Sequence, residues 1–224
     1  MNKFSQAFCF ALLFIMTHHV LANTSVDVRS EYESWNSGIN GNSSALLLGL
    51  GGTKSITPEL TASAGFMTGE YDSSSEQLEE TLNRNDIDLA IGYRFTPNVN
   101  LFVGYRLVQI DYSTNLAQQR SFSDLTHGLG IGVDAFQVVY PKTAVYGRLG
   151  ISGLFSTIDS DQTGTDRGLG FSTGIEGGIV YQIMERTNIG VSLKQQSSTV
   201  DYGDNSTNWK SNYVRYGISL GHLF

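Results

Sequence analysis

The stretch LGFSTGIEGGIVY at residues 169–181 carries the pattern that decides the fold. Leu, Phe, Thr, Ile, Gly, Ile and Tyr occupy its odd-numbered positions, whereas Gly, Ser, Gly, Glu and Gly occupy positions 170–178 between them. Because side chains alternate between the two faces of a β-strand, the stretch predicts one apolar face and one small, polar face. Residues 60–67 and 86–95 repeat the pattern. A soluble β-sandwich also alternates, so the connections must separate the two architectures.

Two classes of connection alternate along the chain. Short turns surround Pro58, Pro97, Pro141 and Arg186, which recur at intervals of about 40 residues. Proline has no N–H to donate to a sheet, so these positions favour turns. Longer polar linkers, rich in Ser, Asn, Asp, Gly and Gln, lie at 37–43, 73–85, 113–123, 157–167 and 201–211. Short turns at one end and long loops at the other are typical of outer-membrane barrels, and this count predicts ten strands.

Composition narrows the class further. Charged residues make up 16% of the 224 residues, against about 25% in an ordinary soluble domain. No run after residue 22 reaches the roughly 18 apolar residues of a membrane-spanning helix. The single cysteine excludes a disulfide scaffold and a thiolate zinc site. A single β-rich domain remains.

The first 22 residues have the features of a secretory signal peptide. Lys3 precedes an apolar stretch from Ala7 to Met16, and the segment ends in Val-Leu-Ala at Ala22. This apolar stretch is too short to span a bilayer but suits a signal sequence. Cys9 lies inside the apolar stretch, which disfavours a lipoprotein anchor. We therefore predict a signal peptide at 1–22 and one barrel domain at 23–224.

The last strand ends with alternating Tyr216, Ile218 and Leu220 and a terminal Phe224. This pattern resembles the signal by which the assembly machinery of bacterial outer-membrane barrels recognises its clients, although His222 departs from it. With the hairpin repeat, the mature chain resembles a small outer-membrane β-barrel of the OmpX or opacity-protein type. The resemblance implies an all-β, closed antiparallel transmembrane barrel with both termini in the periplasm. Ten strands are expected and eight are the alternative; outer-membrane lipid, lipopolysaccharide and the assembly machinery are the expected partners.

Charged residues fall on the inward face of the predicted strands. Parity places there Arg29, Glu31, Asp86, Asp88, Arg94, Arg106, Asp134, Arg148, Glu176, Lys194 and Arg215, together with Asp27 and Glu33. Charges in a narrow barrel are costly unless paired, so we expect an interstrand network that plugs the lumen. The alternative is a lining for small ions. Aromatic residues near strand ends, among them Trp35, Tyr71, Tyr112 and Tyr181, predict interfacial girdles.

The residues do not favour an enzyme. Asp86 and Asp88 resemble the Asp-x-Asp pair of the ten-stranded omptin proteases, but the fourth long loop lacks the histidine of the partner pair. His127 is expected at the lipid-facing rim, and His222 lies at the opposite end of the barrel. We expect no catalytic residues, no metal site and no cofactor.

The long loops are the remaining place for a function. Acids outnumber bases there, with Arg84 counted among the bases, so nucleic acid is disfavoured as a partner. Leu78, Leu82, Tyr202 and Trp209 are the candidate surface contacts, with a short helix beginning near residue 73. We expect surface interaction, adhesion or an envelope-structural role through a host or envelope protein. A narrow solute channel is the alternative, and a protease or lipid-modifying enzyme is weaker still.

Overall fold

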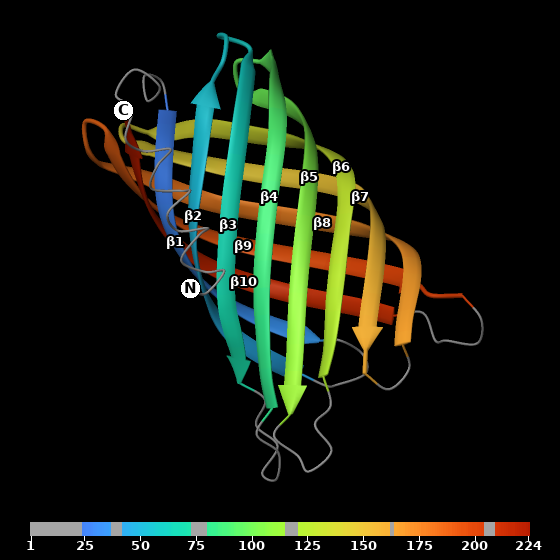
Figure 1. Cartoon of the computed structure of the whole chain (residues 1–224). Coiled ribbons are helices and arrows are strands. Elements are labelled where there is room, and N and C mark those ends of the chain that lie inside the picture. Colours follow the sequence, from blue (N-terminus) through green and yellow to red (C-terminus); the bar gives the residue numbers. More distant parts are fainter. Residues whose placement is uncertain (1–23, 37–41, 73–79, 115–120, 162–163, 204–208) are drawn as a thin grey trace.

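The computed structural model describes residues 24–36, 42–72, 80–114, 121–161, 164–203 and 209–224, and nearly all of them lie in strands. The strands are β1 (Thr24–Asn36), β2 (Asn42–Ser55), β3 (Leu60–Asp72), β4 (Glu80–Thr96), β5 (Val99–Thr114), β6 (Ser121–Tyr140), β7 (Thr143–Ser160), β8 (Gly164–Met184), β9 (Thr187–Asp201) and β10 (Trp209–Leu223) (Figure 1). The predicted count of ten strands is confirmed, and the alternative of eight is wrong.

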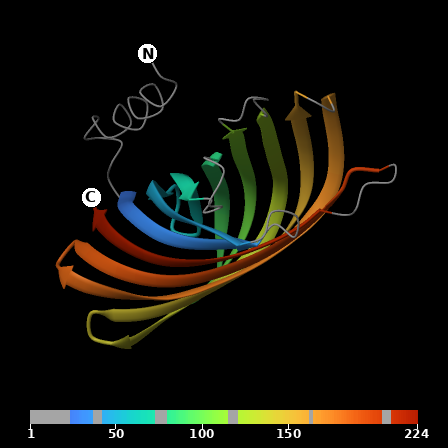
Figure 2. The same ribbon diagram turned by 90° about the horizontal axis from the view of Figure 1, so that it is seen from below.

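Each strand pairs antiparallel with its neighbours in sequence, and β1 pairs with β10 to close the barrel. Seen from below, β1 (blue) lies beside β10 (red) (Figure 2). Closure removes both sheet edges, which satisfies the backbone hydrogen bonds of every strand. None of the described segments forms a helix long and apolar enough to cross a membrane.

The barrel has two unlike ends. The turn end carries the short connections that contain Pro58, Pro97 and Pro141, and there the Phe224 amide donates to the Thr24 carbonyl at 2.9 Å. Lys142 follows Pro141 with a φ of 69°, the backbone conformation that a tight turn requires after proline. The loop end carries the connections after β1, β3, β5, β7 and β9.

Strands at the loop end run further than the sequence predicts. β4 begins at Glu80 and β6 at Ser121, and β7 continues to Ser160, so parts of the predicted loops are strand. Residues 81–85 pair with both β3 and β5, and Glu80 pairs with β5, and this pairing overrides the helical spacing of their side chains. The predicted helix is wrong for these residues, and its first part, 73–79, lies outside the described residues.

The strands are strongly tilted. A path across the hydrogen-bonded partners leaves β1 at Thr24 and returns to it at Asn36, twelve residues further along. Such a stagger requires a strand tilt of about 40°. The path passes through Lys54, Ala62, Ile91, Val103, Ile131, Ile151, Thr173, Ser197 and Asn212. The path runs from the turn end to the loop end. Its middle residues are apolar, and the residues nearest the loop end are polar.

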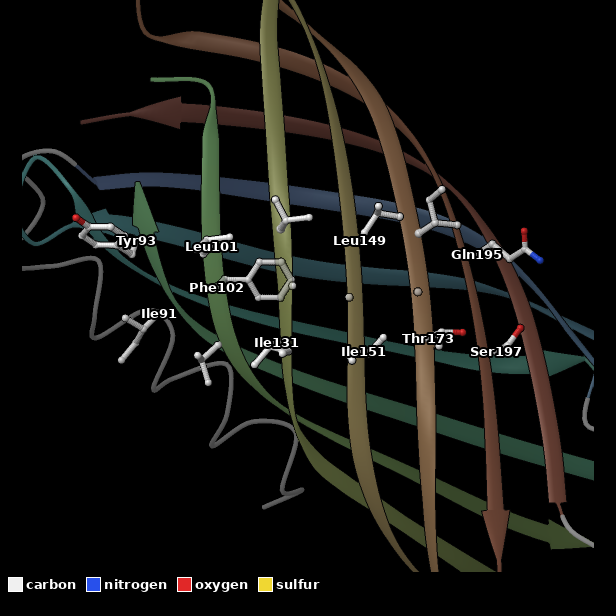
Figure 3. A pocket seen from close by; sticks show the side chains of 16 residues that line it. Ile91, Tyr93, Leu101, Phe102, Ile131, Leu149, Ile151, Thr173, Gln195 and Ser197 are labelled. Carbon is white, nitrogen blue, oxygen red and sulfur yellow. The ribbon is translucent and has the colours of Figure 1, made fainter. Parts of the chain in front are cut away.

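Apolar side chains cover the outer wall. Leu129, Ile131 and Ile151 are more than half exposed, as are most of their outward neighbours. Figure 3 shows part of this path across the strands, with Ile131 and Ile151 in line with Thr173 and Ser197. This row and the next one line an apolar hollow of about 1100 Å³. The wall has the apolar band that contact with lipid requires.

A second apolar cluster lies inside the barrel, toward the loop end. It comprises Trp35, Ala45, Leu47, Met67, Tyr71, Leu82, Ile110 and Tyr213, all buried. The girdle prediction is wrong for Trp35 and Tyr71, because both rings point into the lumen and lie 5.5 Å apart. It is also wrong for Tyr112, which packs against this cluster and stacks on Phe122 at 4.9 Å. Strand-end position alone does not distinguish an inward ring from an outward one.

Candidate functional site in the barrel lumen

The lumen holds two groups of charged side chains. The first, here the closing cluster, comprises Glu31, Glu33, Arg84, Asp86, Asp88, Arg106 and Arg215. The second, here the turn-side group, comprises Asp27, Arg29, Asp134, Arg148, Glu176 and Lys194. Ten of the eleven residues predicted for a lumen network lie in one of the two groups.

Asp86 is the centre of the closing cluster. Its Oδ2 accepts hydrogen bonds from Arg106 Nη2 and Arg215 Nη2, both at 2.7 Å, and from Arg84 Nη2 at 3.2 Å. Its Oδ1 accepts from Arg84 Nε at 2.7 Å. The Asp86 side chain is 1% exposed. One carboxylate therefore joins arginines from β4, β5 and β10 across the lumen.

Glu33 is the second buried carboxylate of the cluster, with no exposed side-chain area. Arg84 Nη1 donates to Glu33 Oε1 at 2.6 Å, and Arg215 Nε donates to Glu33 Oε2. The Tyr71 hydroxyl donates to Glu33 Oε1 and accepts from Arg84 Nη1 at 3.1 Å. Each oxygen of Glu33 is thus engaged by at least one charged donor.

The Tyr213 ring organises the arginines from one side. The guanidinium carbons of Arg215, Arg84 and Arg106 lie 4.7, 5.0 and 5.7 Å from the ring centre. The Tyr213 hydroxyl also accepts from Arg106 Nη1 at 2.5 Å and donates to Gln196. A ring face attracts cations, so Tyr213 stabilises three neighbouring like charges beyond their carboxylate pairs.

Every arginine of the closing cluster lies within ion-pair distance of at least one carboxylate. Two buried carboxylates face three arginines, and Glu31 and Asp88 at the margin add further acid at 3.5 and 3.4 Å. An isolated buried charge costs several kcal/mol, and close pairing with hydrogen bonds offsets this. Together with the apolar cluster next to it, the closing cluster fills the lumen toward the loop end.

The turn-side group is more exposed than the closing cluster. Arg148 donates to both oxygens of Asp134 at 2.6 and 3.2 Å, and the Arg148 side chain is 50% exposed. Arg29 pairs with Asp27, and the Tyr146 hydroxyl donates to Glu176 at 3.0 Å. All of the turn-side group except Asp27 lines a cavity of about 400 Å³, whose wall also includes Arg106 and Arg215 of the closing cluster. Arg94, the eleventh predicted residue, is exposed beside the turn after β4 and has no ion pair within the described residues.

Sequence reasoning misplaced Arg84. The sequence predicts Arg84 as a basic residue of a loop. In the structure its side chain is 4% exposed and lies in the closing cluster. The signal was present: Arg84 has the same parity as Asp86 and Asp88, and the alternation simply continues toward Glu80. The polar composition of residues 73–85 favours a loop and obscures this parity.

The candidate surface contacts have different positions. Leu82 is buried in the apolar cluster, so its prediction as a surface contact is wrong; Leu78 lies outside the described residues. Tyr202 and Trp209 flank the last loop, with ring centres 6.2 Å apart, and both are partly buried. Burial, with the neighbouring Asp124 and Asp166 carboxylates, raises the pKa of the Tyr202 hydroxyl.

The remaining predicted residues lie on the outer wall. Tyr216, Ile218 and Leu220 are all more than half exposed there, and Phe224 follows them at the turn end. His127 lies between the rings of Tyr105 and Phe155, and His222 approaches Thr187 with its Nδ1 at 3.0 Å. Within the described segments, no group of three or more His, Cys, Asp or Glu residues could hold a metal ion.

No protein-family model and no curated protein matches the sequence. Solved structures do match. The outer-membrane protease OmpT from Escherichia coli is 12% identical, with a TM-score of 0.61 over 91% of this chain and 97% of that one. The β domain of the Bordetella autotransporter BrkA is 9% identical, with a TM-score of 0.52 over 90% and 100%. The fold is that of a small outer-membrane β-barrel. At these identities the likeness shows the fold alone.

Proposed function

We propose that this chain is an integral outer-membrane barrel with a closed lumen, which serves surface interaction or envelope structure through its loop end. The closing cluster is the observation that carries the proposal. Its central side chains, Glu33, Arg84, Asp86 and Arg215, are each at most 4% exposed. A barrel whose interior is filled by such a cluster is suited to holding its wall rigid and presenting its loops.

Three features support a location in the outer membrane. The outer wall is apolar, the closed barrel has no free edge, and the solved structures with this fold include an outer-membrane protease. In this proposal the turn end faces the periplasm and the loop end faces the outside, as is usual for barrels with short turns and long loops. The signal peptide predicted at 1–22 lies outside the described residues.

A narrow channel is the second candidate, because the cavity at the turn end favours it. About 400 Å³ lined by charged and glycine residues is enough to admit small polar solutes from the turn end. This cavity stops at the closing cluster, so conduction requires the salt bridges of Asp86 to open. Separating a buried pair costs about 3–5 kcal/mol. We therefore favour the closed barrel.

The proposal assigns the chain no enzymatic activity. Asp86, the residue that resembles half of an omptin acid pair, accepts hydrogen bonds from three arginines. Such a carboxylate is held as a structural anion and is poorly placed to orient water. Neither described histidine contacts it.

Conductance in planar lipid bilayers tests the closed lumen. We expect no stable steps from the native barrel under conditions in which a known porin conducts. A variant with Glu33, Arg84, Asp86 and Arg215 all replaced by alanine is expected to show small steps, whereas Asp134→Ala/Arg148→Ala stays silent. Reproducible steps from the native barrel would support the channel instead.

Accessibility on intact cells tests the orientation. An epitope tag inserted after residue 205 is expected to bind antibody without permeabilisation of the cells. A tag inserted after Pro141 is expected to bind antibody only in permeabilised cells. A binding assay for surface partners then uses a deletion confined to 73–79. A longer deletion that removed Leu82 and Arg84 would disturb the lumen and confuse loop function with folding.

A further inference from the structure

Asp124 is a buried acid with no ion-pair partner in the part of the chain that the structure describes. Its side chain, on β6, is 8% exposed, and its Oδ1 accepts from Ser156 Oγ at 2.8 Å and from Thr126 Oγ1 at 3.0 Å. Among the described residues, Oδ2 makes no hydrogen bond, and no lysine or arginine lies within ion-pair distance. Glu33 and Asp86, the other buried acids among the described residues, are both paired with arginine, so Asp124 differs from them in having no ion-pair partner there.

A small pocket at the loop end opens onto Asp124. It has a volume of about 70 Å³ and is lined by Trp35, Tyr202 and Trp209 as well as by Asp124. The Tyr202 hydroxyl lies 2.7 Å from Ser156 Oγ, so it belongs to the same hydrogen-bonded group. Carboxylate and hydroxyl oxygens line one part of the pocket, and aromatic rings line the other.

The arginines in the pocket wall make no hydrogen bond to Asp124, although the positive charge of Arg84 acts on it from a distance. Arg84 and Arg106 line the pocket, but Arg84 is bonded to Asp86 and Glu33, and Arg106 to Asp86. Asp166 acts on Tyr202 from the rim and adds a second negative charge there. The mouth of the pocket therefore attracts cations.

We propose that this pocket binds a primary ammonium group, entering from the loop end, with Asp124 as its anion and the Tyr202 and Trp209 rings beside it. Carboxylate and hydroxyl acceptors suit a group with three N–H donors. Aromatic faces attract the same charge. The pocket is small, at about 70 Å³, which suits an ammonium head with its first methylene. A trimethylated head has no N–H to donate to Asp124 and is therefore disfavoured.

The ammonium group has two possible sources, a free alkylamine or the lysine side chain of a partner. A partner's lysine would give the surface interaction of the proposed function a chemical basis. In that respect this inference rests on the proposed function. Binding to purified, folded barrel does not depend on membrane orientation. Its failure would leave the membrane proposal, which conductance and tag accessibility test, untouched.

Intrinsic fluorescence reports directly on this pocket, because Trp35 and Trp209 line it and the sequence has only two tryptophans. The folded barrel in detergent is titrated with n-butylammonium chloride, and with potassium chloride and tetramethylammonium chloride at equal ionic strength. We expect a saturable change with butylammonium alone. Asp124→Asn should weaken it by about tenfold or more, as loss of a charged hydrogen bond predicts. The control Asp159→Asn removes an exposed acid at the same end and should leave it unchanged.

Heat-modifiable gel migration verifies that both variants are folded barrels. An equal response in Asp124→Asn, or an equal saturable response to potassium, would overturn the proposal. A second arm compares a lysine peptide with its norleucine counterpart. Saturation by the lysine peptide alone assigns the source to a partner's lysine, and saturation only by butylammonium assigns it to a free amine.

Discussion

Replacing Asp86 by asparagine isolates the charge at the centre of the closing cluster without changing its shape. The carboxylate accepts four hydrogen bonds from three arginines. An asparagine amide offers one oxygen, so at best it keeps the three bonds at the Oδ2 position. It then loses the bond from Arg84 Nε and turns an N–H toward that donor. Three guanidiniums would be left with Glu33 as their only fully buried carboxylate.

The expected loss of unfolding free energy is about 3–5 kcal/mol, the usual cost of removing one partner from a buried ion pair. The matched control is Asp134→Asn, whose partner Arg148 is 50% exposed. Solvent screens that pair, so its loss should cost no more than about 1 kcal/mol. Urea unfolding of both variants in the same lipid vesicles, followed by gel migration, measures the difference. Equal losses in the two variants would refute the view that the closing cluster is the better-buried and more strongly coupled group.

Three further predictions address packing, hydrogen bonding and the membrane. Gly128→Ala should prevent folding, because its Cβ would collide with the backbone oxygen of Gly153, whereas a Cβ at Gly153 meets nothing within 4 Å, so Gly153→Ala should give normal heat-modifiable migration. Tyr71→Phe removes a hydroxyl bonded to a buried carboxylate and should lower the unfolding free energy by about 1–3 kcal/mol in urea titrations. In vesicles, Ile151→Arg should lower the unfolding free energy by about 2–4 kcal/mol and Ser197→Arg by less than about 1 kcal/mol. The reason is that the tilted path across the strands leaves the lipid between these two residues. Equal losses would contradict the tilt.

Parity predicted the wall of this barrel well. The alternation at 86–95 and 169–181 predicts the inward residues correctly. The turn of each hairpin then fixes which residues of its two strands lie opposite each other. Asp134 and Arg148 are direct partners on β6 and β7, and Glu176 and Lys194 are direct partners on β8 and β9. Such pairs follow from register, and register follows from the position of each turn.

Contacts across the lumen did not follow from parity. Arg84 on β4 bonds Glu33 on β1, and Arg215 on β10 bonds Asp86 on β4, yet none of these strand pairs is adjacent. They meet because a barrel closed by only ten strands has a lumen narrow enough for long side chains to cross, and the tilt sets which residues lie at the same level. Closure and tilt are properties of the whole barrel, and no single hairpin encodes them.

The same reasoning explains why the two charged groups differ although their residues look alike in the sequence. Glu33, Arg84 and Arg215 sit at levels where Tyr71, Leu82 and Tyr213 fill the remaining space, so their charges are dry and strongly coupled. Nearer the turn end, glycines occupy the inward positions beside Arg148 and Glu176, and a cavity remains. What a charge does in this lumen is therefore set by the size of its uncharged neighbours. Large neighbours exclude open space around the closing cluster, whereas glycines leave a cavity nearer the turn end.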